Sequence, residues 1–135
     1  MAVRRFEDLI AWQLAHELEQ EIFAFTANSP AVRDVTFCAQ IRESSRSAPR
    51  NTAEGFGRYY PREFVRFLRI AAGSLSETKH QLHEAVDRKY LTKSEHERLL
   101  RLCLRALKAN IRLARYLLTA TAPAPLPERN ERSAD

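Results

Sequence analysis

Six cationic side chains between residues 98 and 115 are spaced alternately three and four residues apart. This spacing places all six on one side of an α-helix, in a stripe about 26 Å long at a rise of about 1.5 Å per residue. The segment contains no acidic residue that could neutralise them. Such a surface can bind the phosphate backbone of RNA or DNA, with salt-sensitive affinity that depends little on base sequence. The six residues are Arg98, Arg101, Arg105, Lys108, Arg112 and Arg115.

Two other interpretations of this stripe remain open. It can be a solvated helix face, or it can be a contact between subunits in which acidic residues of the first helix pair with the cations. The acidic residues in question are Glu7, Asp8, Glu17, Glu19 and Glu21.

A second cationic series runs through the middle of the chain, with Tyr59 and Tyr60 at its centre. Arginine beside exposed tyrosine can hold a single strand, because tyrosine stacks on bases. Packing of such tyrosines at helix ends or subunit contacts is the more frequent arrangement. Arg58 and Arg62 flank the tyrosines and are the members that we expect to contact nucleic acid. The full series is Arg42, Arg46, Arg50, Arg58, Arg62, Arg66 and Arg69.

Four uncharged or acidic polar residues lie inside the second and third predicted helices: Gln40, Asn51, Glu54 and Glu77. Two carboxylates can serve as an acid and a base in catalysis. We favour a buried polar network that joins the two helices and fixes their register, because an unpaired buried carboxylate is costly.

Other motifs that could indicate phosphate binding, a metal site or a disulfide are weak. Gly55-Phe56-Gly57 follows no strand and precedes no Lys-Ser/Thr pair, so it does not form a phosphate loop. Glu77 and His80 have the spacing of di-iron bundles, which need that motif on two helices. Cys38 and Cys103 are interpreted as reduced, buried side chains rather than a disulfide. We therefore expect no enzyme activity, no metal and no cofactor.

Apolar periodicity predicts four helices that must position these residues. The first spans about 6–26. The second begins after a cap at Thr36, continues through a kink at Pro49 and ends between residues 55 and 57. The third begins at Pro61, and Gly73 within it suggests close contact between helices. The fourth begins with a cap at Thr92 or Ser94, where Ser94 and Glu97 fit a capping box, and continues to 119.

The composition fits one compact all-α domain. The chain has 135 residues, 44% of them hydrophobic, a net charge of +5 and only three glycines. Short connections between long helices imply an antiparallel up-down-up-down four-helix bundle over 1–118, followed by a disordered Pro-rich tail over 119–135. No apolar run reaches the ~20 residues of a membrane span, so we expect a cytoplasmic protein with no membrane partner.

Several motifs resemble one known family in the same order along the chain. They are Phe6 to Gln13 (FEDLIAWQ), Gln40 to Arg42, Ser47 to Pro49, Asn51 to Gly55, Phe64 to Leu68, and the stretch IAAGSLSE that ends at Glu77. The family is the four-helix-bundle proteins first noticed as products of intervening sequences in bacterial 23S rRNA genes. The resemblance covers about residues 5–118. Thr52 and Ala48 stand where the family usually has isoleucine.

The resemblance implies an antiparallel four-helix bundle that assembles as a homopentameric ring and has no established enzymatic activity. A distantly similar protein, the accessory variability determinant of diversity-generating retroelements, is a basic pentamer that binds a reverse transcriptase and nucleic acid. By this analogy we expect an oligomer that binds RNA, DNA or a nucleoprotein through its basic helix faces. The alternative is a structural assembly or adaptor protein without a nucleic-acid partner.

Overall fold

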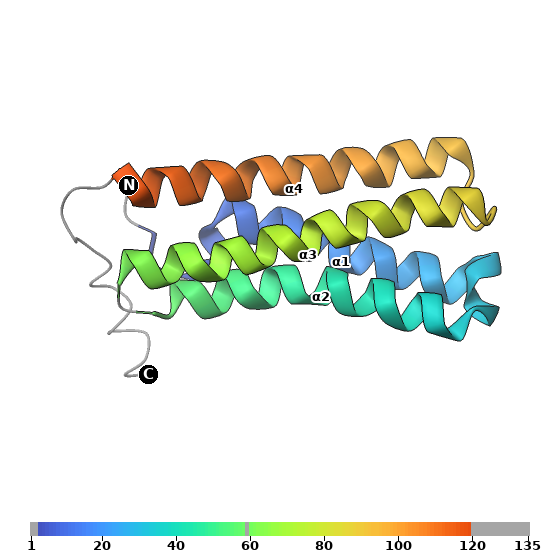
Figure 1. Ribbon diagram of the computed structural model, residues 1–135, viewed down its shortest axis with the longest axis horizontal. Helices are drawn as coiled ribbons and strands as arrows, with labels where there is room; N and C mark the ends of the chain where they lie inside the picture. Colours follow the sequence, from blue (N-terminus) through green and yellow to red (C-terminus); the bar gives the residue numbers. More distant parts are fainter. Residues whose placement is uncertain (1–2, 59, 120–135) are drawn as a thin grey trace.

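The computed structural model describes residues 3–58 and 60–119, and these residues form helices without any strand. Four long helices, α1 (Ile10–Asn28), α2 (Val35–Phe56), α3 (Pro61–Asp87) and α4 (Lys93–Thr119), are accompanied by two short 3₁₀ helices, η1 (Phe6–Asp8) and η2 (Pro30–Arg33). Figure 1 shows successive long helices running in opposite directions along the longest axis. The predicted all-α, antiparallel four-helix bundle is confirmed. The predicted tail lies almost entirely outside the described residues.

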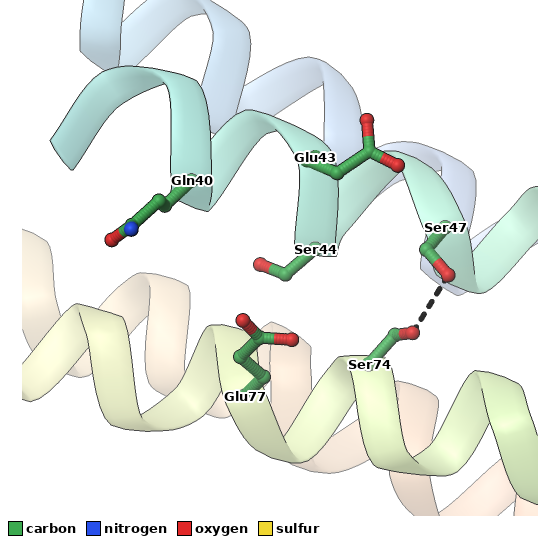
Figure 2. A pocket seen from close by; sticks show the side chains of 6 residues that line it. All are labelled: Gln40, Glu43, Ser44, Ser47, Ser74 and Glu77. Carbon is green, nitrogen blue, oxygen red and sulfur yellow. Dashed lines mark hydrogen bonds between the residues drawn. The ribbon is translucent and has the colours of Figure 1, made fainter. Parts of the chain in front are cut away.

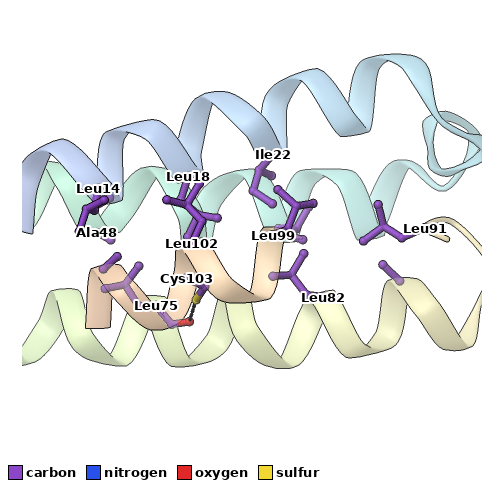
Figure 3. Close-up of a cluster of buried hydrophobic side chains, with 14 of the residues drawn as sticks. Leu14, Leu18, Ile22, Ala48, Leu75, Leu82, Leu91, Leu99, Leu102 and Cys103 are labelled. Carbon is purple, nitrogen blue, oxygen red and sulfur yellow. Dashed lines mark hydrogen bonds between the residues drawn. The ribbon is translucent and has the colours of Figure 1, made fainter. Parts of the chain in front are cut away.

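Each long helix packs mainly against two others, in the cyclic order α1, α2, α3, α4. Their amphipathic faces meet in a central core, in which Leu18, Ile22 and Leu82 are fully buried (Figure 3). Burial of one such side chain contributes about 1.5–3 kcal/mol relative to exposure. A second cluster, which includes Phe56 and Phe64, fills the end of the bundle at the α2–α3 hairpin. The core therefore extends along the whole bundle and holds the outer helix faces in fixed positions.

The start of α1 differs from the continuous helix predicted over 6–26. Leu9 has an extended backbone (φ −77°, ψ 127°) and separates η1 from α1. The side chain of Leu9 enters the hairpin-end cluster, whereas the side chain of Ile10 is 64% exposed. The predicted end is confirmed, since α1 stops at Asn28, just before Ser29 and Pro30.

The N-cap of α2 is Asp34, so the prediction of Thr36 was wrong. The Asp34 carboxylate accepts a hydrogen bond from the Phe37 backbone N–H at 3.1 Å. It also accepts from the Tyr90 hydroxyl at 2.6 Å and from Arg88 at 3.1 Å, which ties the start of α2 to the α3–α4 turn. The helix then continues through Pro49 to Phe56, as predicted.

The close contact between helices lies at Gly55 of α2 and not at Gly73 of α3. A Cβ on Gly55 would lie 2.8 Å from Phe67 Cβ and 3.2 Å from the Phe64 carbonyl oxygen, so α2 approaches α3 closely there. A Cβ on Gly73 would meet nothing within 4 Å. The prediction that Gly73 marks a close helix contact was therefore wrong for this chain on its own, and Gly55 marks one instead.

The beginning of α4 carries a capping box two residues earlier than the one predicted at Ser94 and Glu97. The Thr92 backbone N–H donates to Glu95 Oε1 at 2.8 Å, and the Glu95 N–H donates to Thr92 Oγ1 at 3.1 Å. The turn before it contains Lys89 with φ 64°, in the left-handed region. Thr92, one of the two predicted caps, is thus the cap.

Both cysteines are buried free thiols. Burial raises the pKa of the Cys103 thiol to about 11, and the thiol donates to the Leu75 carbonyl oxygen at 3.3 Å (Figure 3). None of the described helices has the long uncharged apolar stretch that a bilayer span requires.

Candidate nucleic-acid interface

The stripe predicted from the spacing of cations lies along the outer face of α4. All six side chains are exposed. The Thr92–Glu95 box sets the beginning of this helix, and its core face fixes the rotation of the helix about its own axis. Cys103 and Asn110 on that face bond to the α3 backbone, at Leu75 and Leu68. The cations therefore point away from the bundle.

One of the six cations has an acidic partner within the chain. Arg98 Nη1 lies 3.0 Å from Glu21 Oε1 of α1, so this residue is paired and contributes less free charge than predicted. Among the described residues, the other five take part in no ion pair or hydrogen bond. These five span about 21 Å along the helix at about 1.5 Å per residue. We call them the α4 stripe: Arg101, Arg105, Lys108, Arg112 and Arg115.

The three arginines of α2 from the second series already have partners within this chain. Arg42 Nε donates to Thr26 Oγ1 of α1 at 2.7 Å. The guanidinium groups of Arg42 and Arg46 lie 4.9 and 5.1 Å from the centre of the Phe23 ring. Arg46 and Arg50 lie 3.2 and 3.6 Å from Glu43. Arg42 and Arg46 therefore join α2 to α1. Arg46 and Arg50 pair with a carboxylate of their own helix.

Arg58 and Arg62, both expected to contact nucleic acid, have different surroundings. Arg58 pairs with Glu54 at 3.0 Å and lies 4.9 Å from the centre of the Phe67 ring. Arg62 is exposed and has no ion pair with any described residue. Of the two, only Arg62 therefore offers a free charge. Tyr59 lies outside the described residues, and Tyr60 is 62% exposed.

The packing of α3 on α4 brings the two cationic series together. Leu68 lies level with Asn110 and Leu75 with Cys103, as their hydrogen bonds show. The same antiparallel register places Arg62 and Arg69 of α3 beside the second half of α4. Both are exposed and, within residues 3–58 and 60–119, without an ion pair. One face of the bundle therefore carries cations from two helices.

Tyr116 is an exposed aromatic residue in this region that sequence reasoning did not single out. It is 64% exposed and lies one helical turn after Arg112. An aromatic ring among unpaired arginines can stack on a base while the arginines contact phosphates. The signal was present in the sequence, because Tyr116 directly follows Arg115 and falls off the apolar face of the helix.

The predicted buried network of Gln40, Asn51, Glu54 and Glu77 is not what joins α2 and α3. Gln40, Glu54 and Glu77 are exposed, and Asn51 bonds within α2 to the Ser47 carbonyl and hydroxyl. Carboxylates stay at the surface because α2 and α3 pack too closely there to include them. Small hydroxyls and one amide join the helices instead, through Ser44 with Thr78 at 2.8 Å, Ser44 with Gln81 at 2.6 Å and Ser47 with Ser74 at 2.7 Å.

A shallow pocket of about 340 Å³ lies over this hydroxyl contact, between α2 and α3. Figure 2 shows Glu43 and Glu77 at its two sides, with the Ser47–Ser74 hydrogen bond at one end. The lining comprises Gln40, Glu43, Ser44, Ser47, Ser74 and Glu77. Because it contains two carboxylates and no cation, this pocket does not favour phosphate, and the phosphate-binding candidates lie on a different face.

The Glu77–His80 motif does not gather further ligands. His80 lies 3.8 Å from Glu84 on its own helix, and the His83 and His96 rings lie 4.9 Å apart. No group of three His, Cys, Asp or Glu side chains within the part of the chain that the structure describes is arranged to hold a metal ion.

Comparisons with known proteins agree with the fold. A search of curated protein sequences found no match. A crystal structure of a protein of unknown function from the S23 ribosomal protein family of Bacteroides thetaiotaomicron superposes with a TM-score of 0.74 and 19% sequence identity, over 81% of this chain and 98% of that chain. At that identity the likeness supports the four-helix fold alone. Residues 7–111, well over half of the chain, match the family of 23S rRNA-intervening sequence proteins, and we conclude that this protein belongs to that family.

Proposed function

We propose that this protein binds RNA or DNA, free or in a nucleoprotein, through phosphate contacts of the α4 stripe, and that it has no catalytic activity. The observation that supports this most is the set of five exposed stripe cations without an acidic partner among the described residues. Unpaired cations on a rigid helix attract a polyanion and release its condensed counterions on binding. Arg62 and Arg69 extend the cationic surface onto α3.

The contrast with α2 and with the end of α3 favours a ligand over plain solvation. The carboxylates of Glu43, Glu54 and Glu84 each lie within 4 Å of an arginine or histidine of this chain. The second half of α4 has no such pairing. A phosphate backbone supplies the missing negative charge at regular intervals, and Tyr116 supplies a stacking surface next to it.

The test compares two variants with the same change in net charge. One replaces Arg101, Arg105 and Arg112 by glutamine, and the matched control replaces Arg33, Lys89 and Lys93, which are exposed cations outside the stripe. Binding of fluorescently labelled single-stranded RNA and duplex DNA is measured by anisotropy from 50 to 300 mM salt. Each phosphate contact contributes about 0.7–0.9 to the slope of log K against log salt. We expect the stripe variant to lower this slope by about 2 and the control to leave it nearly unchanged.

Equal losses in the two variants would show that only net charge matters, and unchanged binding in the stripe variant would show that α4 is not the site. Circular dichroism spectra of both variants check that the fold is retained.

We also propose that the protein assembles into a homo-oligomeric ring, for which the family resemblance suggests five subunits. Ile70 supports a contact between copies, since its side chain is 43% exposed beside Gly73, where an added Cβ would meet nothing within 4 Å. Light scattering on the same variants tests the structural alternative. If the stripe variant reduces the mass of the assembly and binds nucleic acid normally, the stripe is a subunit contact and the protein is a structural assembly.

A further inference from the structure

The helix α4 carries a second apolar stripe that the bundle leaves largely uncovered. Its members are spaced four, three, four, three and four residues apart, which is the heptad pattern by which one helix packs on another. Leu104, Ile111 and Leu118 are 44%, 48% and 58% exposed. The other three are partly buried. We call this set the α4 seam: Leu100, Leu104, Leu107, Ile111, Ala114 and Leu118.

The seam is distinct from the core face of the same helix. Cys103 and Asn110 bond to the α3 backbone, and Leu104 and Ile111 each follow one of them, rotated by about 100° around the helix axis. Arg98, which reaches Glu21 of α1, lies on the opposite flank of α4. The exposed members of the seam, Leu104, Ile111 and Leu118, therefore run along the outer side of the α3–α4 groove, whereas Leu107 and Ala114 pack against the core clusters of the bundle.

Cations border the seam on its α4 side. In heptad terms Leu104, Ile111 and Leu118 occupy the a positions, and Arg101, Lys108 and Arg115 occupy successive e positions. Residues at e face the g positions of a partner helix in a coiled coil and select their charge. Three cations at e therefore select acidic residues at g of the partner.

Cations also border the seam on its α3 side. The contact of His83 with His96 shows which edge of α3 faces α4. Positions 76, 69 and 62 precede His83 by one, two and three heptads on that edge, with an outward drift of about 20° per heptad. Arg69 and Arg62 are therefore turned outward from that edge by about 40° and 60°, near the levels of Ile111 and Leu118, since Leu68 is level with Asn110.

We propose that the α4 seam binds an amphipathic helix of a partner protein whose apolar heptad stripe is flanked by glutamate or aspartate. The apolar stripe fits the uncovered leucines and isoleucine, and the acidic flanks fit the cations on both sides. A second copy that used its own α4 seam would bring like charges together at the e positions, and a second copy that used another face, as in a ring, is distinguished by the light-scattering test below. The acidic helix of the chain, α1, also fits poorly, because Glu21 already pairs with Arg98.

The probe is a synthetic three-heptad peptide with leucine at a and d and glutamate at e and g, labelled with fluorescein. A matched peptide carries lysine at e and g. Binding to the full chain is measured by anisotropy at 150 mM salt. We expect the acidic peptide to bind at least tenfold more tightly than the basic peptide, because only its charges complement the cations.

Two protein variants locate the contact. Leu104→Gln with Ile111→Gln removes apolar surface and keeps every cation, whereas Val35→Gln removes an apolar side chain that is 74% exposed at the start of α2. We expect the first to weaken peptide binding at least tenfold and the second to leave it unchanged. Lys108→Glu with Arg69→Glu provides a second test in case the apolar variant folds poorly, and it should reverse the preference toward the basic peptide.

Three other results of these experiments would each overturn the proposal. Equal binding of the two peptides would show unspecific apolar contact. A lower assembly mass for the seam variant by light scattering, without peptide binding to the wild type, would show that a second copy covers the seam. Binding to phosphatidylserine vesicles without peptide binding would assign the seam to a lipid surface. The outcomes for the Leu104→Gln/Ile111→Gln variant are separate from nucleic-acid binding, because that variant keeps the whole α4 stripe, whereas the Lys108→Glu/Arg69→Glu variant changes one stripe residue.

Discussion

The arginines of α2 and α4 have similar spacing in the sequence and different surroundings in the bundle. Arg42 and Arg46 of α2 contact the Phe23 ring, and Arg42 also bonds to Thr26 of α1. Arg105 and Arg112 of α4 are exposed and, among the described residues, unpaired. The α2 cations therefore contribute to the stability of the bundle, and the α4 cations are left available for a partner.

The glycines show the same difference between inner and outer positions. Gly55 lies where α2 approaches α3, and an added Cβ would come within 3.0 Å of two phenylalanine side chains. Gly73 lies on the outward face of α3, and no atom is within 4 Å of its virtual Cβ. The residue type alone therefore does not show whether a glycine is needed for packing inside the bundle or lies at its surface, because this depends on the groups packed around it.

The largest effect that we expect from this contrast is on the free energy of unfolding of two alanine variants. Gly55→Ala should destabilise the fold by about 1–3 kcal/mol, because Phe67 Cβ and the Phe64 carbonyl cannot move away without displacing α3. Gly73→Ala should stabilise the isolated chain by up to about 1 kcal/mol, because alanine favours the helix and meets no neighbour. Urea denaturation measures both.

A destabilised Gly73→Ala variant would contradict this expectation for the isolated chain. If the assembly loses mass and the monomer gains stability, Gly73 is kept for a contact between copies, in agreement with the proposed self-association.

A smaller effect should distinguish Arg42 from Arg105. Arg42→Met removes a hydrogen bond to Thr26 and a cation–π contact with Phe23, and should lower the free energy of unfolding by about 1–2 kcal/mol. Arg105→Met removes no contact within the described chain and should change it by less than about 0.5 kcal/mol. Urea denaturation of the two variants side by side gives both values.

Nucleic-acid binding of the same pair should show the opposite order, with the larger loss in Arg105→Met. Equal losses of stability would mean that the α2 contacts contribute little. Equal losses of nucleic-acid affinity in Arg42→Met and Arg105→Met would mean that α4 is not the preferred binding surface over α2.

The number of helices, their order and most of their core faces could be predicted from apolar periodicity, since the bundle buries one face of each helix. The helix starts were predicted less well. Thr92, one of the two predicted caps, does cap α4. Thr36 has a suitable side chain, but Asp34 caps α2, and the Asp34 carboxylate also accepts from Tyr90 and Arg88. Such contacts join segments more than 50 residues apart, which local pattern does not reveal.

The candidate site was predicted in part. The positions of the α4 cations on one face follow from spacing alone. That Arg98 pairs with Glu21, and that Arg62 and Arg69 lie beside α4, depends on how the helices pack. Glu54 and Glu77 were predicted to belong to a buried network, because a buried carboxylate without a partner destabilises the fold. The close packing of α2 on α3 admits hydroxyls instead, such as Ser44 against Thr78.

The smallest of the expected effects concerns the pH dependence of stability at the Asp34 cap. Hydrogen bonds from the Tyr90 hydroxyl and then the Phe37 backbone N–H, with the nearby charge of Arg88, hold the pKa of the Asp34 carboxyl below its ordinary value. The unfolded chain therefore takes up this proton first as pH falls. The stabilisation is present above about pH 4, the ordinary value of an aspartate, and disappears as pH falls through the lowered pKa of the folded state.

Asp34→Ala should accordingly lower the melting temperature at pH 7, and the difference from wild type should shrink between pH 5 and pH 2. Thr36→Ala is the matched control, because Thr36 is exposed and does not cap the helix. Thermal unfolding followed by circular dichroism at several pH values measures both. A loss that stays constant with pH would mean that the ionised carboxylate is not what stabilises the start of α2, and an equal loss in Thr36→Ala would return the cap to the residue that the local pattern had indicated. Either result would weaken the contrast between α2 and α4, since it would remove one of the contacts by which α2 is tied to the rest of the bundle.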